Sequence, residues 1–219
     1  LLVDMHGSYT PKGLYRTYPN LLTYEGVLGM EQGARCKPEN SNWLPFIRNA
    51  VGPMDFTPGS MFSAQPEDNR STGANPMGTG TRAYQMALYV VFESPLQMLA
   101  DNPVLYRREH PCTEFLAAVP TTWDSLRVLH AACGREVVVA RRKGDKWYVG
   151  GITNDRPYTT EIALDFLPAG RTFTMTSFED GVNADLQATD YRKRVREVDA
   201  STVVKVEMVR NGGWAAVIE

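Results

Sequence analysis

Two glutamates bracket a short apolar segment near the start of the chain, and they are the first residues whose types and spacing could do chemistry. The stretch from Arg16 to Gln32 reads RTYPNLLTYEGVLGMEQ, with Glu25 and Glu31 at the two ends of the apolar run GVLGM. A carboxylate is costly to bury unless a charge or hydrogen bonds compensate it. The pair therefore indicates either a shared positive partner or two ordinary solvent-facing loop acids.

The two carboxylates can reach one point only if the segment between them bends. In a straight strand they would share a face but lie about 20 Å apart, because a strand rises about 3.3 Å per residue. Gly26 and Gly29 interrupt the run, and glycine permits sharp bends and close backbone approach. Carboxylate oxygens are the ligands that a hard cation such as Ca²⁺ prefers. A bent segment would favour a calcium site, whereas exposed loop acids remain the ordinary alternative, since glutamate is mostly exposed.

The elements that would position these acids alternate between short apolar runs and helical segments. The runs LLVDMH, GVLGM, AVGPMD and PLQML have the length of strands and are apolar on both sides, which is typical of a parallel sheet covered on both faces. The stretch TGTRAYQMALYVVFES keeps apolar residues at helical spacing, with Thr81 as its N-cap. Alternating strands and helices predict βαβ units and an α/β architecture in the first part of the chain.

The second part of the chain has the pattern of an all-β domain. VVVARRKGDKWYVGGITN predicts two strands around a KGDK turn, and EIALDFL, RTFTMTSF, TVVKVEMV and WAAVIE follow with turn signals between them. Short strands at such intervals predict a small antiparallel β-sandwich. The basic run YRKRVRE has acidic neighbours, which favours a solvated strand or loop over a nucleic-acid surface.

Composition excludes several classes of protein. The chain has 219 residues, 43% of them hydrophobic and 22% charged, with a net charge of −2, so it is globular and has no basic footprint for nucleic acid. Its three cysteines form no CxxC pair, which argues against a disulfide framework and a zinc site. No apolar run approaches the ~18 residues of a membrane helix. The abrupt apolar start LLVDMHG predicts that the chain is a piece of a longer protein.

Several long motifs resemble family 97 glycoside hydrolases. They are HGSYTPKGLYRTYPNLLTYEGVLGMEQ, WLPFIRNAVGPMDFTPG and SPLQMLADNP, followed by PTTWDS, VVVARRKGDKWYVGGITN and LDFLPAG. The resemblance implies a catalytic (β/α)8 barrel between a large amino-terminal β-domain and a small carboxy-terminal sandwich. The expected fold class is α/β plus β. Residues 1–130 would form the second half of a (β/α)8 barrel of the TIM type, with LLVDMHG as the fifth strand, and residues 131–219 would form an antiparallel β-sandwich.

The same resemblance implies roles for three residues. Glu31 matches the general acid of the family, Glu25 matches a carboxylate ligand of its calcium ion, and Glu31 also lies at that ion. His6, at the end of the fifth strand, would bind substrate through a sugar hydroxyl. All three would lie at the carboxy-terminal ends of barrel strands, where barrel active sites form. Glycosidic cleavage needs a proton donor at the leaving oxygen, and a nearby cation can orient the sugar and the acid. The implied cofactor is Ca²⁺.

A glycosidase also needs a second carboxylate, and the residue after His6 bears on it. In the inverting branch of the family a glutamate base follows this histidine, but here Gly7 does. In the retaining branch an aspartate nucleophile comes from an earlier strand, which would lie upstream of Leu1. Asp4 is three residues before Gly7, an odd separation that predicts the opposite face of the strand and a structural or supporting role. The resemblance thus favours a calcium-dependent, retaining α-galactosidase that cleaves terminal α-glycosidic bonds.

Two other functions stay open on the sequence. One is an inverting α-glucosidase of the same family whose base comes from elsewhere. The other is a non-catalytic carbohydrate-binding module, which the sandwich would suit but the paired acids would not. Asp55, in GPMDFTPG, is expected to cap the turn that follows it.

The resemblance also bears on partners and on the isolated chain. The expected partners are an α-linked oligosaccharide or glycoside and the rest of the barrel upstream, in a bacterial periplasm. The chain alone is expected to be inactive and poorly stable, because a half-barrel exposes two sheet edges.

Overall fold

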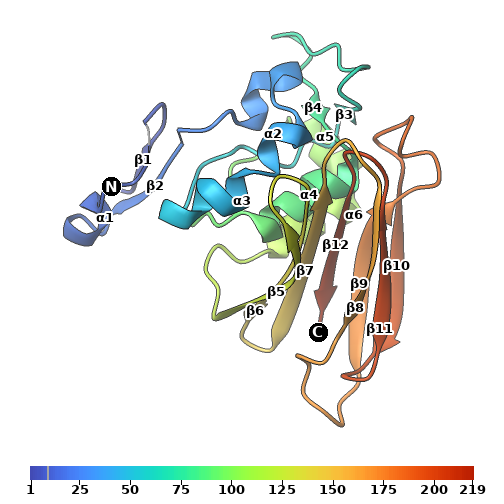
Figure 1. Cartoon of the computed structure of the whole chain (residues 1–219). Helices are drawn as coiled ribbons and strands as arrows, with labels where there is room; N and C mark the ends of the chain where they lie inside the picture. Colours follow the sequence, from blue (N-terminus) through green and yellow to red (C-terminus); the bar gives the residue numbers. More distant parts are fainter. Residues whose placement is uncertain (9) are drawn as a thin grey trace.

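The computed structural model describes residues 1–8 and 10–219, which form a mostly β fold with a smaller helical part (Figure 1). The first part of the chain contains β1 (Val3–Met5), α1 (Leu14–Thr17), β2 (Leu21–Tyr24), η1 (Met30–Arg35), α2 (Pro38–Ser41), α3 (Leu44–Ile47), η2 (Asn49–Val51), β3 (Ser63–Ala64), β4 (Gly78–Thr79), α4 (Arg82–Val91), α5 (Pro103–Arg108) and α6 (His110–Ala118).

The second part of the chain consists of long antiparallel strands. These are β5 (Ser125–Ala132), β6 (Glu136–Lys143), β7 (Lys146–Thr153), β8 (Tyr158–Ala163), β9 (Phe173–Asp180), β10 (Tyr191–Val198), β11 (Val203–Met208) and β12 (Gly213–Ile218). Six of them form one sheet in the order β10-β9-β12-β7-β6-β5, and β8 pairs with β11 in a separate two-stranded ribbon. The predicted antiparallel β region is therefore confirmed.

Each face of the six-stranded sheet is covered by a different layer. Along β6, Val137 and Val139 join a core that includes α4 and α6, whereas Val138 and Ala140 join a core shared with the β8–β11 ribbon. Successive residues of a strand point to opposite faces, so this single apolar run serves both cores. Figure 1 shows α4 on one side of the sheet and the β8–β11 ribbon on the other.

Helix α4 lies unusually close to the sheet because glycines face it. A Cβ atom at Gly150 would lie 2.8 Å from the Val90 Cβ, and one at Gly213 would lie 2.3 Å from the Tyr84 Cα. All ten residues of α4 are buried. The predicted helix is confirmed, but it is enclosed on every side rather than exposed along one face.

The start of α4 is tied to the sheet through a buried carboxylate. Thr81 Oγ1 accepts a hydrogen bond from the Tyr84 amide at 3.0 Å, which confirms the predicted cap, and the same hydroxyl donates to Asp180 Oδ1 at 2.6 Å. Asp180 Oδ2 accepts from the amides of Val209 and Gly213 at 3.0 and 3.1 Å. One side chain at the end of β9 thus joins a helix cap, the chain after β11 and the start of β12.

Some of the short apolar runs are strands and others are not. LLVDMH contains β1, and AVGPMD contributes a parallel bridge at Met54. The strand predictions for GVLGM and PLQML are wrong, because the first run bends at its glycines and the second, which begins with Pro95, is a loop. The basic run YRKRVRE forms β10, a solvated edge strand of the sheet.

The larger divisions of the chain follow the strands. The sheet begins with β5 at Ser125, whereas the predicted division between residues 130 and 131 falls inside that strand. In the first part, β1 and β2 pair in parallel. The (β/α)8 barrel to which they were expected to belong remains a prediction about a longer protein. Across residues 1–8 and 10–219, no helix combines the length and apolarity that crossing a bilayer requires.

The buried carboxyl of Asp180 predicts a dependence of stability on pH. Burial raises its pKa from 3.8 to about 7. The folded state therefore holds a proton that the unfolded state has already lost, and stability should fall as pH rises from about 4 to about 7. The loss amounts to about 4 kcal/mol at most. The Asp180→Asn variant, which keeps the shape without the charge, should match wild type near pH 4 and exceed it above pH 7 in urea unfolding.

The matched control is Asp145→Asn, in the exposed turn between β6 and β7. Its unfolding free energy should follow wild type at every pH. Parallel pH profiles for wild type and Asp180→Asn would contradict the assignment of a buried, proton-binding carboxyl.

Candidate active site and cation centre

Three parallel segments end at one edge and bring three polar residues together there. β1 pairs in parallel with β2, and Tyr24 of β2 forms a parallel bridge with Met54. His6 follows β1 directly, Glu25 follows β2, and Asp55 follows Met54. The carboxyl ends of neighbouring parallel strands meet at the same edge, where the sites of parallel α/β folds form.

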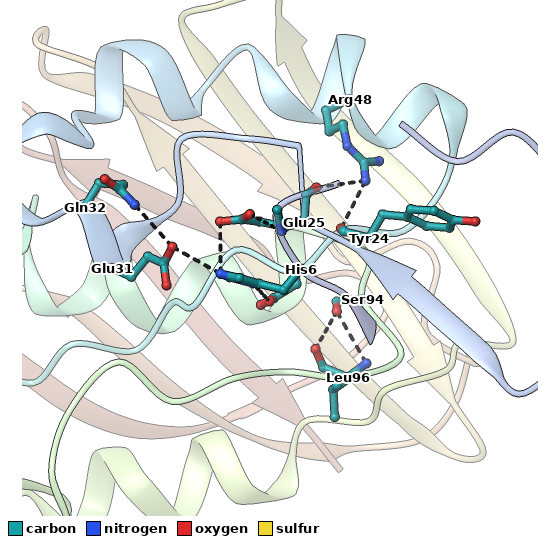
Figure 2. A network of polar contacts seen from close by, with 10 residues as sticks. His6, Tyr24, Glu25, Glu31, Gln32, Arg48, Ser94 and Leu96 are labelled. Carbon is teal, nitrogen blue, oxygen red and sulfur yellow. Dashed lines mark hydrogen bonds and ion pairs between the residues drawn. The ribbon is translucent and has the colours of Figure 1, made fainter. Parts of the chain in front are cut away.

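Backbone hydrogen bonds hold this register through the polar residues themselves. The Glu25 amide donates to the Met5 carbonyl at 3.3 Å, and the Asp55 amide donates to the Tyr24 carbonyl at 2.9 Å. The buried Arg48 adds a second anchor, because its Nη2 donates to the carbonyls of Tyr24 and Glu25 at 3.1 and 3.0 Å (Figure 2). The backbone of Glu25 is therefore fixed on both sides.

Glu31 reaches the same edge because the GVLGM segment turns back. Gly26 has a φ of +60°, in the left-handed region that favours glycine. A Cβ at Gly29 would lie 2.8 Å from the Phe56 carbonyl oxygen, to which the Met30 amide donates at 2.9 Å. The glycines thus allow the bend that the sequence left open, and it places Glu31 at the start of η1 beside Glu25.

The two glutamates converge on one atom of His6. Its Nε2 lies 3.5 Å from Glu25 Oε1 and 3.4 Å from Glu31 Oε1, as Figure 2 shows. Glu25 Oε2 accepts from the Gly7 amide at 2.7 Å, and Gln32 Nε2 donates to Glu31 Oε1 at 3.2 Å. The side chain of Glu25 is 12% exposed and that of Glu31 is 37% exposed. Glu25 thus lines the wall of the site, and Glu31 lies at its solvent side.

Asp55 supports the other nitrogen of His6. Its side chain is buried, and its Oδ2 lies 3.1 Å from His6 Nδ1. The expectation that Asp55 caps the following turn is wrong, because in the described part of the chain its carboxylate meets the imidazole and no turn amide. The signal was present in the sequence, since this aspartate follows an apolar run just as Glu25 follows LLTY.

Asp4 lies beside Asp55 and adds to the concentration of carboxylates. Ligand atoms of Asp4, His6 and Asp55 all lie within 4.8 Å of one another. Burial, with a contribution from Asp55, raises the pKa of Asp4 to about 6, and the hydrogen bond to Asp55 raises the pKa of His6. Both shifts favour protonation of groups that face carboxylates, so the site attracts positive charge.

The donor set fits part of a calcium site. His6 Nε2 and one oxygen each of Glu25 and Glu31 lie within 4.8 Å of one another. Ca²⁺ takes six to eight ligands, chiefly oxygens, so the two carboxylates match its preference and the imidazole nitrogen does so less well. The remaining ligands would have to be water, substrate or other protein segments.

Comparisons with known proteins bear on the fold and the family. Residues 122–219 match the family described as "Glycosyl-hydrolase 97 C-terminal, oligomerisation". The whole chain is 43% identical over 224 residues to a protein from Bacteroides thetaiotaomicron named "Retaining alpha-galactosidase". A relative from Streptomyces bingchenggensis is 34% identical over 217 residues, which span 99% of this chain and 31% of the relative.

Solved structures show the same similarity. A glycoside hydrolase family 97 enzyme from Pseudoalteromonas, in complex with panose, has a TM-score of 0.88 and 36% identity, covering 100% of this chain and 35% of that one. A β-arabinopyranosidase has a TM-score of 0.80 and 28% identity over 99% of this chain and 34% of that one.

The chain spans about a third of the length of these relatives, because the match covers 34% of the Bacteroides protein and 35% of the Pseudoalteromonas structure. Similarity runs along the whole chain and includes both the strand-end site and the carboxy-terminal sheet. Residues 122–219 therefore form the carboxy-terminal domain of glycoside hydrolase family 97, and the chain as a whole is similar to an enzyme of that family.

Proposed function

We propose that this chain supplies the acid/base catalyst and part of the calcium site of a retaining α-galactosidase. The observation that carries the proposal is the convergence of Glu25 and Glu31 on His6 at the ends of parallel strands. The 43% identity to a protein named as a retaining α-galactosidase supports the choice of reaction and sugar. In the complete enzyme, β1, β2 and the Met54 segment would be neighbouring strands in the second half of a (β/α)8 barrel.

Glu31 is suited to deliver and recover a proton. Its Oε1 accepts a hydrogen bond from Gln32 Nε2 and faces His6, which leaves Oε2 as the oxygen to carry the proton toward the glycosidic oxygen. Its 37% exposure places it where a sugar can approach. After the leaving group departs, the same carboxylate would take a proton from the attacking water, as retention requires.

Gly7 supports a retaining reaction over an inverting one. Its φ is +70°, a backbone conformation in which a glutamate would be strained, and its amide holds Glu25 Oε2. The base of the inverting branch has no equivalent at this position. The nucleophile would then be an aspartate from a segment of the enzyme that this chain does not include.

Glu25 and Glu31 would hold the calcium ion. When bound, the ion supplies positive charge that orients sugar hydroxyls and offsets the negative charge of the clustered carboxylates. His6, 48% exposed on its side chain, faces the same point and would hydrogen-bond a sugar hydroxyl. The buried Arg48 and the Gly7 amide keep Glu25 in place as the sugar enters and leaves.

The general-acid role of Glu31 predicts a dependence on the leaving group. In the complete enzyme, Glu31→Gln should lower kcat/KM toward unactivated α-galactosides by about 10²–10⁴-fold. Its loss toward an aryl α-galactoside with a very good leaving group should be much smaller, because that group departs without a proton. Glu39→Gln, at an exposed acid on α2, is the matched control and should behave as wild type. Equal losses toward both substrates would remove Glu31 from the acid role.

Retention predicts the first product. Proton NMR of α-galactoside hydrolysis should show α-galactose before mutarotation produces the β-anomer. An initial β-anomer would indicate inversion and a base elsewhere. Hydrolysis of an α-glucoside in preference to the α-galactoside would change the proposed substrate to a glucoside. The proposed roles of the carboxylates would stay the same.

The calcium site predicts a metal-dependent shift in thermal stability. Added Ca²⁺ at about 100 times its Kd should stabilise the wild-type enzyme by about 2.7 kcal/mol relative to enzyme with chelator. Glu25→Gln should lose most of that stabilisation, whereas Glu114→Gln, an exposed acid on α6, should keep it. Calcium stabilisation of the same size in Glu25→Gln would place the ion elsewhere.

A further inference from the structure

We infer that Asp55 is a positioning residue, which holds His6 with its proton on Nδ1 and aims the Nε2 lone pair at the point between Glu25 and Glu31. The inference concerns a residue that the proposed acid and calcium roles do not use. The expected effect of Asp55 on activity rests on the proposed function, whereas its expected effect on the proton position of His6 does not.

The hydrogen bond decides which ring nitrogen carries the proton. An ionised carboxylate can only accept, so the imidazole must donate across the 3.1 Å from Nδ1 to Asp55 Oδ2. In the neutral ring the other nitrogen, Nε2, then has a free lone pair. Without Asp55, the proton would favour Nε2, where two carboxylate oxygens at 3.4 and 3.5 Å would accept it.

Asp55 is itself held rigidly enough to act as a support. Its amide donates to the Tyr24 carbonyl, and the amide of Met54 donates to the Glu93 carbonyl at 3.0 Å, so the backbone is bonded on both sides. The side chain is 1% exposed, which excludes the water that would otherwise compete for the bond. A buried carboxylate whose side-chain partners are an imidazole and the carboxyl of Asp4 is costly to maintain for packing alone.

The consequence for the site is one more hydrogen-bond acceptor, His6 Nε2, at the point that a donor atom of the ligand would occupy. Glu25 and Glu31 already direct two oxygens at one point, and a lone pair on Nε2 makes a third electron-rich group there. Such a point suits a group with a positive or donating atom, either a sugar hydroxyl or the cation. A protonated Nε2 would instead occupy it by pairing with the two carboxylates.

The experiment reads the proton position directly. ¹⁵N-histidine NMR of the complete enzyme at pH 9 reports both ring nitrogens, and the signals that disappear in His6→Gln belong to His6. Wild type should show a protonated Nδ1 and a bare Nε2. Asp55→Asn should move the proton to Nε2 in most molecules. Asp4→Asn, which removes a carboxylate that bonds to Asp55 and not to His6, should leave the proton on Nδ1.

Kinetics of the complete enzyme give the second readout. Asp55→Asn should raise KM for an α-galactoside at least about 10-fold with a smaller change in kcat, as expected when a substrate-binding group is misaligned. Asp4→Asn should change KM less. The inference is overturned if wild-type His6 carries its proton on Nε2, or if Asp55→Asn changes neither the proton position nor KM.

The two readouts separate this inference from the proposed function. The expected proton position in a protein that hydrolyses no α-galactoside would keep the role of Asp55 and reject the proposed substrate. Hydrolysis of α-galactosides with His6 unchanged in Asp55→Asn would keep the function and reject the positioning role.

Discussion

The parallel register of β1, β2 and the Met54 segment is the constraint on which the candidate site depends. Each segment contributes the first polar residue after its last strand residue, and the Glu25 and Asp55 amides close the ladder. Sliding one strand by a residue would turn His6, Glu25 or Asp55 to the opposite face. The carboxylates and the imidazole meet only because all three segments run in the same direction and end at the same level.

The rest of the fold holds the third of these segments in place. The Glu93 carbonyl, just beyond α4, accepts the Met54 amide, and Gln85 within α4 accepts the amides of Gly59 and Ser60. Helix α4 is in turn pressed against Gly150 and Gly213 of the sheet and tied to Asp180 at its start. A continuous set of contacts therefore runs from the carboxy-terminal sheet through one buried helix to the chain on either side of Asp55.

The electrostatics of the site follow from this convergence. Asp4, Glu25, Glu31 and Asp55 lie around a single imidazole, and carboxylates so close together favour a proton or a cation among them. The raised pKa values of Asp4 and His6 express the same tendency. Arg48 donates to the backbone carbonyls of Tyr24, Glu25 and Gly52 and so holds the strand ends beside this cluster in place. The cluster thus favours a ligand that carries positive charge or donates a hydrogen bond.

The sequence by itself determined the elements whose signals are local. The helical spacing after Thr81, the turn at Gly144 and Asp145 and the alternation of the later strands depend on neighbours within a few residues, and the structure confirms them. Two glycines between Glu25 and Glu31 made a bend possible, but the same run was also expected to be a strand. Tertiary structure alone decided the partners that are distant in sequence. Asp55 meets His6 across 49 residues, and GVLGM turns back because Met30 finds the Phe56 carbonyl. The local sequence around a residue does not predict such contacts, because the contacts form only when distant segments pair in the folded chain.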